Sequence, residues 1–194
     1  MSADHPTSLT LLQRLRAREQ DAWGRLLQLY TPLVRSWCHH QGVRGADADD
    51  LVQEVFQAVV TGLAQFQRDR PGDTFRGWLR GITWHKLLDF FRRQSSQPRG
   101  QGGTAAGQQL QQVPQAEVSF PEETPQEVAE LYQRAIELVK SEFEANTWRA
   151  FWRTAVDGRS PAEIATELDM SAAAVRMAKS RVLRRLRQEI GDAS

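Results

Sequence analysis

The stretch "SPAEIATELDMSAAAVRMAKSRVLRRLRQEI", residues 160–190, carries the strongest local structural signals in the chain. Ser160 is a good helix N-cap, Pro161 suits the first helical position, and Glu163 completes a capping box. After the short turn "DMS", Ser171 is placed to cap a second helix. Two helices joined by about three residues indicate a helix-turn-helix, so this stretch predicts that motif.

The apolar spacing agrees with this prediction. Val175, Val182 and Leu186 recur on one face of the second helix and are predicted to point inward. Turns of this kind favour glycine at the position of Asp169, and aspartate tolerates a positive φ better than most residues. The sequence is therefore compatible with a tight turn that needs a positive φ at Asp169.

The second helix of such a motif enters the major groove of DNA, and its first turns read base edges. Arg176 and Lys179 are candidates for base or phosphate contacts, whereas Arg181, Arg184 and Arg185 are candidates for phosphate contacts. The run Ala172–Ala174 allows close approach and contact with thymine methyl groups. The predicted duplex-contacting residues are Ser171, Ala172, Ala174, Arg176, Lys179, Ser180, Arg181 and Arg184. An ordinary helical hairpin with a solvated basic face is the alternative.

Helical spacing extends over most of the chain, and no segment alternates as a strand would. Residues 94–115 are rich in Gln, Gly and Ser and cannot bury enough apolar surface to order themselves. We therefore predict an all-α fold of two small helical domains, residues 1–94 and 125–194, joined by a flexible linker at 95–124. Pro32 is expected to kink the chain or to mark a helix boundary.

Composition excludes several classes of protein. The chain has 194 residues, a net charge of +1 and one cysteine, so an internal disulfide is excluded. No apolar run approaches the roughly 18 residues of a membrane span, and the N-terminus lacks a signal-peptide pattern. We expect a cytoplasmic protein without membrane insertion.

A helix is predicted over about residues 46–66, and four carboxylates gather near its start: Asp47, Asp49, Asp50 and Glu54. Helix capping alone accounts for them at this level, because carboxylates favour the helix dipole there. Cys38, His39 and His40 are adjacent in sequence, which is poor ligand geometry on a helix. With no Ser-His-Asp, Cys-His or phosphate-loop pattern evident, we expect no metal, no cofactor and no catalytic residue.

The stretch "FRGWLRGITWHKLLDFFRR", residues 75–93, mixes aromatic and cationic side chains. At 100° per residue, Phe75, Trp78, Leu79 and Ile82 form an inward face, while Trp84, Leu87, Leu88 and Phe91 form a second stripe nearly opposite. Such a helix either changes its packing partner midway or exposes aromatic rings. Exposed rings among cations suit single-stranded nucleic acid, so Trp84 is compatible with either a core or a DNA-contacting position.

In combination and in order, these motifs resemble those of the extracytoplasmic-function (ECF) sigma factors, the smallest members of the sigma-70 family. "DADDLVQEVF", residues 47–56, resembles the region 2 motif that docks on the clamp helices of RNA polymerase. Residues 75–93 resemble the segment that melts and reads the −10 promoter element. Residues 125–190 resemble region 4, whose helix-turn-helix reads the −35 element.

The resemblance implies roles for particular residues. The polymerase-facing set is Asp49, Asp50, Gln53 and Glu54. The −10 set comprises Phe66, Arg68, Asp73 and Thr74 around the loop that captures a flipped base, and Arg76, Arg80, Trp84, His85, Lys86, Arg92 and Arg93 on the helix. His85 stands where the family usually has Asn.

The function implied is that of a non-enzymatic sigma factor. It would bind core RNA polymerase at the clamp and flap, read double- and single-stranded promoter DNA, and melt the −10 region. The resemblance also implies an anti-sigma partner. The alternative is a stand-alone helix-turn-helix repressor, which would normally bind a palindrome as a two-fold dimer.

Overall fold

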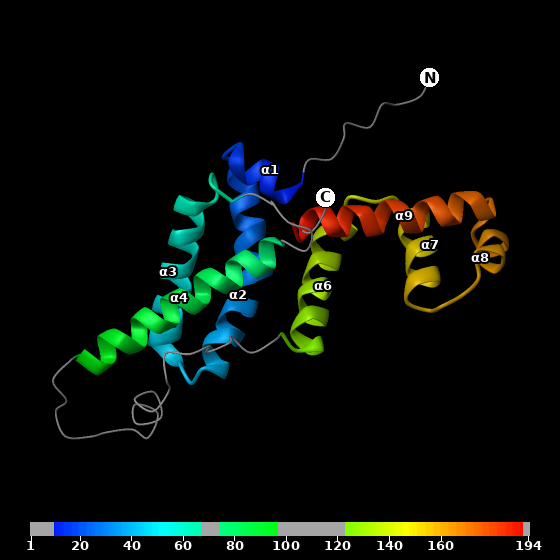
Figure 1. The fold of residues 1–194 in the computed structure, drawn as a ribbon. Coiled ribbons are helices and arrows are strands. Elements are labelled where there is room, and N and C mark those ends of the chain that lie inside the picture. Colours follow the sequence, from blue (N-terminus) through cyan, green and yellow to red (C-terminus); the bar gives the residue numbers. More distant parts are fainter. Residues whose placement is uncertain (1–9, 67–73, 97–122, 192–194) are drawn as a thin grey trace. The chain divides into compact units, whose positions relative to one another are not determined.

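The computed structural model describes residues 10–66, 74–96 and 123–191, and within them every regular element is a helix. This confirms the all-α prediction for the described part of the chain (Figure 1). The helices are α1 (Leu11–Arg16), α2 (Gln20–His40), α3 (Gly45–Gly62), α4 (Phe75–Ser96), α6 (Pro125–Lys140), α7 (Ala145–Ala155), α8 (Pro161–Leu168) and α9 (Ala172–Glu189).

The chain divides into two compact units. We call Met1–Leu29 with Ala129–Ser194 the terminal unit, and Tyr30–Val128 the central unit. The boundaries between them fall inside α2 and α6. The presence of two helical units agrees with the predicted two-domain fold, whereas the units differ in their bounds from the predicted domains 1–94 and 125–194, because residues 1–29 group with 129–194.

Helix α2 runs unbroken from Gln20 to His40 with Pro32 in its interior. The expectation that Pro32 marks a helix boundary is therefore wrong. A proline inside a helix removes one backbone hydrogen bond at a cost of about 3 kcal/mol. The heavy burial of α2, which includes Leu29, Leu33 and Trp37, is the opposing contribution that keeps the helix intact.

In the central unit, α4 crosses α3 and packs against it (Figure 1). The buried side of α3 includes Leu51, Val55 and Val59. One buried stripe runs along α4 at intervals of four residues: Phe75, Leu79, Thr83 and Leu87. Thr83 fits there because its hydroxyl donates a 2.8 Å hydrogen bond to the Leu79 carbonyl. The helix thus keeps one buried face, and Trp84 lies half-buried beside it.

Aromatic rings close the end of the central unit where α4 begins. Phe75 meets Tyr30 edge to face with ring centroids 5.2 Å apart, and Phe66 in the same way at 6.0 Å. Trp78 lies over Phe66 at 4.8 Å. These contacts fix the start of α4 through dispersion and quadrupole geometry as well as area burial.

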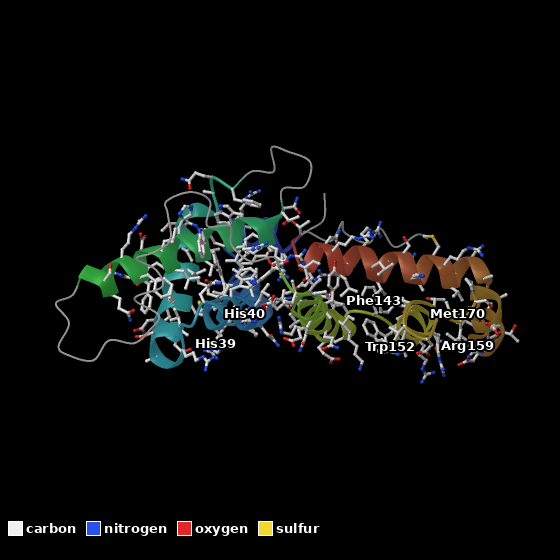
Figure 2. All side chains as sticks on the ribbon, turned by 60° about the horizontal axis from the view of Figure 1, so that its bottom comes forward. His39, His40, Phe143, Trp152, Arg159 and Met170 are labelled. Carbon is white, nitrogen blue, oxygen red and sulfur yellow. The ribbon has the colours of Figure 1, made fainter. Side chains whose placement is uncertain are left out.

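In the terminal unit, α7, α8 and α9 pack around a small apolar core (Figure 1). Ala150, Ile164, Val175 and Ala178 form this core, and each is buried. Met170, in the turn before α9, packs against the same cluster, and Figure 2 shows it on the side of α9 that faces α7. The core therefore fixes both the position and the rotation of α9.

Candidate nucleic-acid interface

The first helix of the predicted helix-turn-helix begins as its sequence predicts. The Ser160 hydroxyl accepts a 3.3 Å hydrogen bond from the Glu163 amide, and the Ser160 amide donates a 2.9 Å bond to the Glu163 carboxylate. Hydrogen bonds from the hydroxyl and the amide of Ser160 lower the pKa of Glu163. The capping box and Pro161 at the first turn are confirmed.

The turn between α8 and α9 is also confirmed. Asp169 adopts the left-handed conformation with φ of 52°. The Met170 amide donates a 2.9 Å hydrogen bond to the Ala165 carbonyl. Ser171 then caps α9, since its hydroxyl accepts a 3.0 Å bond from the Ala174 amide. The start of α9 is thus held by short-range hydrogen bonds as well as by its core.

Because the core fixes the rotation of α9, it also decides which residues face outward. Val175, Ala178 and Val182 point inward, as expected for Val175 and Val182. The exposed residues of the helix are Ala173, Arg176, Met177, Ser180, Arg181, Arg184 and Arg187. We call these seven residues the outer face of α9. It is a stripe of cations with small residues at its centre, which suits close approach to a polyanion.

The predicted duplex-contacting residues fall in two groups. Arg176, Ser180, Arg181 and Arg184 belong to the outer face, and the cap Ser171 is exposed at its start. Ala172, Ala174 and Lys179 are half-buried at the flanks. Ala173, from the run Ala172–Ala174 predicted to allow close approach, is on the outer face. The sequence did not single out Met177, although the spacing of the buried residues along α9 indicates that it points outward.

Arg185 does not belong to this surface, which corrects the interpretation of it as a phosphate contact. Its side chain is 10% exposed and makes two hydrogen bonds to Glu142, Nε to Oε2 at 2.7 Å and Nη2 to Oε1 at 2.9 Å. It also pairs with Glu189, which is fully buried. Arg25 of the same unit pairs with both carboxylates. A buried, multiply paired arginine holds structure together.

The cations of α4 are largely engaged with carboxylates of the chain. Glu54 of α3 lies 3.0 Å from Arg93 and 3.5 Å from Lys86. Arg76 pairs with Glu123 at 2.9 Å. In a separate pair, Arg92 lies 3.2 Å from Asp89. Arg80 is half-buried and His85 is exposed. The Arg92–Asp89 pair is exposed, and exposed pairs contribute little, so a phosphate can replace Asp89 at small cost. The Arg76–Glu123 pair is largely buried.

The four residues predicted around the loop that captures a flipped base differ in their surroundings. The Thr74 hydroxyl accepts a 3.0 Å bond from the Gly77 amide at the start of α4. Phe66 is buried in the aromatic cluster with Phe75 and Trp78. Arg68 and Asp73 lie outside the described residues.

The predicted polymerase-facing residues form an acidic surface at the start of α3. Asp49, Asp50 and Gln53 are exposed, and Asp49 is paired with Arg35. Asp50 and Glu54 line a shallow hollow of about 340 Å³ together with Phe90 of α4. The structure therefore brings acidic residues of α3 and residues of α4 to one surface.

The described residues hold neither a cluster of possible metal ligands nor a helix suited to cross a membrane. They contain no group of three or more His, Cys, Asp or Glu side chains positioned to hold a metal ion. His39 and His40 lie at the end of α2 (Figure 2), and His40 is 3.5 Å from Glu127. Among these same residues, no helix has the length and apolarity needed to cross a membrane.

Comparison with known proteins agrees with these features. Residues 26–97, which contain the acidic surface and α4, match the family Sigma-70 region 2. The ECF RNA polymerase sigma factor SigD of Mycobacterium tuberculosis is 31% identical over 178 residues, an alignment that covers 90% of this chain and 79% of SigD. The chain therefore belongs to the ECF sigma factors of the sigma-70 family.

Two other similarities are more limited. The RNA polymerase sigma factor CnrH of Cupriavidus metallidurans is 34% identical over 73 residues, which cover 38% of this chain and 37% of CnrH. A solved structure of CnrH in complex with the cytosolic domain of CnrY aligns with 91% of this chain and 92% of that one, at 24% identity and a TM-score of 0.37.

Proposed function

We propose that this protein directs transcription initiation as a sigma factor that binds core RNA polymerase and reads both promoter elements. Membership of the ECF sigma factors supports the general function, and that family is not a class of enzymes. The assignment of promoter reading rests on the outer face of α9. Its cations are exposed because the core fixes the rotation of the helix.

In this proposal, α9 lies in the major groove of the −35 element. Arg176 and Lys179 reach base edges or phosphates, and Arg181 and Arg184 hold phosphates. Ser160, Asp169 and Ser171 act indirectly, because they set the start and direction of the two helices. Local hydrogen bonds thus position the two helices, and the outward side chains of α9 recognise the DNA.

The −10 element is assigned to α4 and the loop before it. Arg76, Lys86 and Arg93 exchange their carboxylate partners for phosphates, while Trp84, half-buried, offers part of its ring for stacking on an unpaired base. The carboxylates of Asp49, Asp50 and Glu54 face the polymerase clamp. The remaining partners in the proposal are the polymerase flap and an anti-sigma factor.

Run-off transcription from genomic fragments with purified core RNA polymerase tests this proposal. Addition of the full chain should produce discrete transcripts that core enzyme alone does not make. Sedimentation of the chain with and without core enzyme provides the second measurement. A free dimer that ignores the polymerase and gives no transcripts would overturn the proposal in favour of a repressor.

A further inference from the structure

Met177 is the exposed large apolar side chain on the described part of α9, with 55% of its surface accessible. Methionine is usually buried in folded proteins, and here it stands among cations. Arg176 precedes it, Ser180 and Arg181 follow one turn later, and Arg184 follows two turns later. The cations around it bind anions, and Met177 adds an apolar group to the same face.

The core fixes the direction of Met177. Val175 and Ala178 belong to the small apolar core of the terminal unit, and Val182 is buried on the same side of the helix, so α9 cannot rotate to bury Met177 without exposing them. At 100° per residue, Met177 flanks the line through Ala173 and Ser180, which lies opposite the buried side. Both of those side chains are small, so Met177 projects beyond its neighbours on that line.

The major groove presents one apolar feature, the C5 methyl group of thymine. Methionine suits such a contact because its unbranched thioether is flexible and polarisable. The surrounding cations attract the phosphates on either side of the groove, which favours duplex DNA as the occupant of this face. We propose that Met177 contacts a thymine methyl group in the −35 element and contributes to sequence preference there. This inference rests on the proposed function of α9.

Replacing thymine by deoxyuridine removes only the methyl group, so it tests this contact directly. The probes are duplex fragments of a promoter that yields run-off transcripts with the holoenzyme, each with one −35 thymine replaced. Binding of the holoenzyme should fall at one position by about fourfold, the effect of one buried methyl group. Met177→Ala should bind the unmodified fragment about fourfold more weakly and show no further loss at that position.

Val156→Ala is the matched control, since Val156 is 54% exposed in the same unit but lies at the end of α7. It should bind like the unmodified protein and keep the full response to deoxyuridine. The inference is overturned if the −35 element is bound but Met177→Ala responds to every deoxyuridine substitution as the unmodified protein does. Failure of the holoenzyme to protect any −35 element would instead overturn the proposed function, and this inference with it.

Discussion

Arg185 binds Glu142 through two hydrogen bonds, at 2.7 and 2.9 Å, across 43 positions of the chain. The contact joins α9 to the turn that precedes α7, and the buried Glu189 extends it. Arg184, its neighbour in sequence, is exposed on the outer face of α9. Two adjacent arginines on one helix therefore have separate roles, one in stability and one in binding.

Arg185→Ala should destabilise the protein by about 3 kcal/mol, because it leaves Glu142 and the buried Glu189 without this counter-charge. Thermal or urea unfolding of the full chain measures the change. Arg184→Ala is the matched control and should unfold within about 0.5 kcal/mol of the original protein, as exposed substitutions usually do. Equal stability of the two variants would contradict the structural role of Arg185.

Arg184→Ala should instead weaken promoter binding across sequences, because one phosphate contact is lost. The slope of log K against log salt should become shallower by about 1. Holoenzyme binding to a promoter duplex between low and moderate salt gives this slope. An unchanged slope would exclude Arg184 from the phosphate-contacting set.

Asp50→Lys should greatly weaken binding to core RNA polymerase and leave the fold intact, because Asp50 is exposed at the acidic surface. A pull-down with core enzyme measures the binding, and circular dichroism checks the helices. Asp21→Lys makes the same change of charge at an exposed site on α2 and should bind normally. If both variants bind equally well, Asp50 has no part in docking.

The pH dependence of stability should include a contribution from Glu163. Its pKa is lowered in the folded state, so its stabilising effect is fully present above the ordinary value of 4.5 and is lost as the pH falls through the folded value. Thermal unfolding of the original protein and Glu163→Ala should therefore differ at pH 7 and converge in acid. A difference that stays constant from pH 7 down to acid-induced unfolding would contradict this.

Cys38 should be nearly inert in the folded protein. It is fully buried, and desolvation raises the pKa of its thiol to about 11, so little thiolate exists near neutral pH. Labelling with a thiol reagent at pH 8 should be slow in buffer and rapid in denaturant. Rapid labelling of the folded chain would show that the helix opens locally around Cys38.

The local part of the helix-turn-helix was predictable from sequence, because Ser160, Glu163, Asp169 and Ser171 form their caps and turn with near neighbours. Local rules depend on residue type and short spacing, and both are visible in the sequence. The inward positions of Val175 and Val182 followed from periodicity for the same reason.

Other features depend on contacts between distant residues. Thr83 completes the buried stripe of α4, yet its polar type gives no sign of burial, and the sequence therefore suggested two opposed stripes. Arg185 resembles Arg184 in type and neighbours, and only the distant Glu142 distinguishes it. The half-buried position of Trp84 likewise depends on how α4 packs in three dimensions.

Glu54 takes part in two neighbouring features at once, and this links the binding of two kinds of ligand. It neutralises Lys86 and Arg93 of α4 while also lining the hollow at the start of α3. A ligand that takes this carboxylate removes one negative partner from both Lys86 and Arg93, and the affinity of these cations for an anion then rises. By thermodynamic reciprocity, an anion on those cations frees Glu54 to the same degree. Sharing of Glu54 would in this way couple the two occupancies through charge.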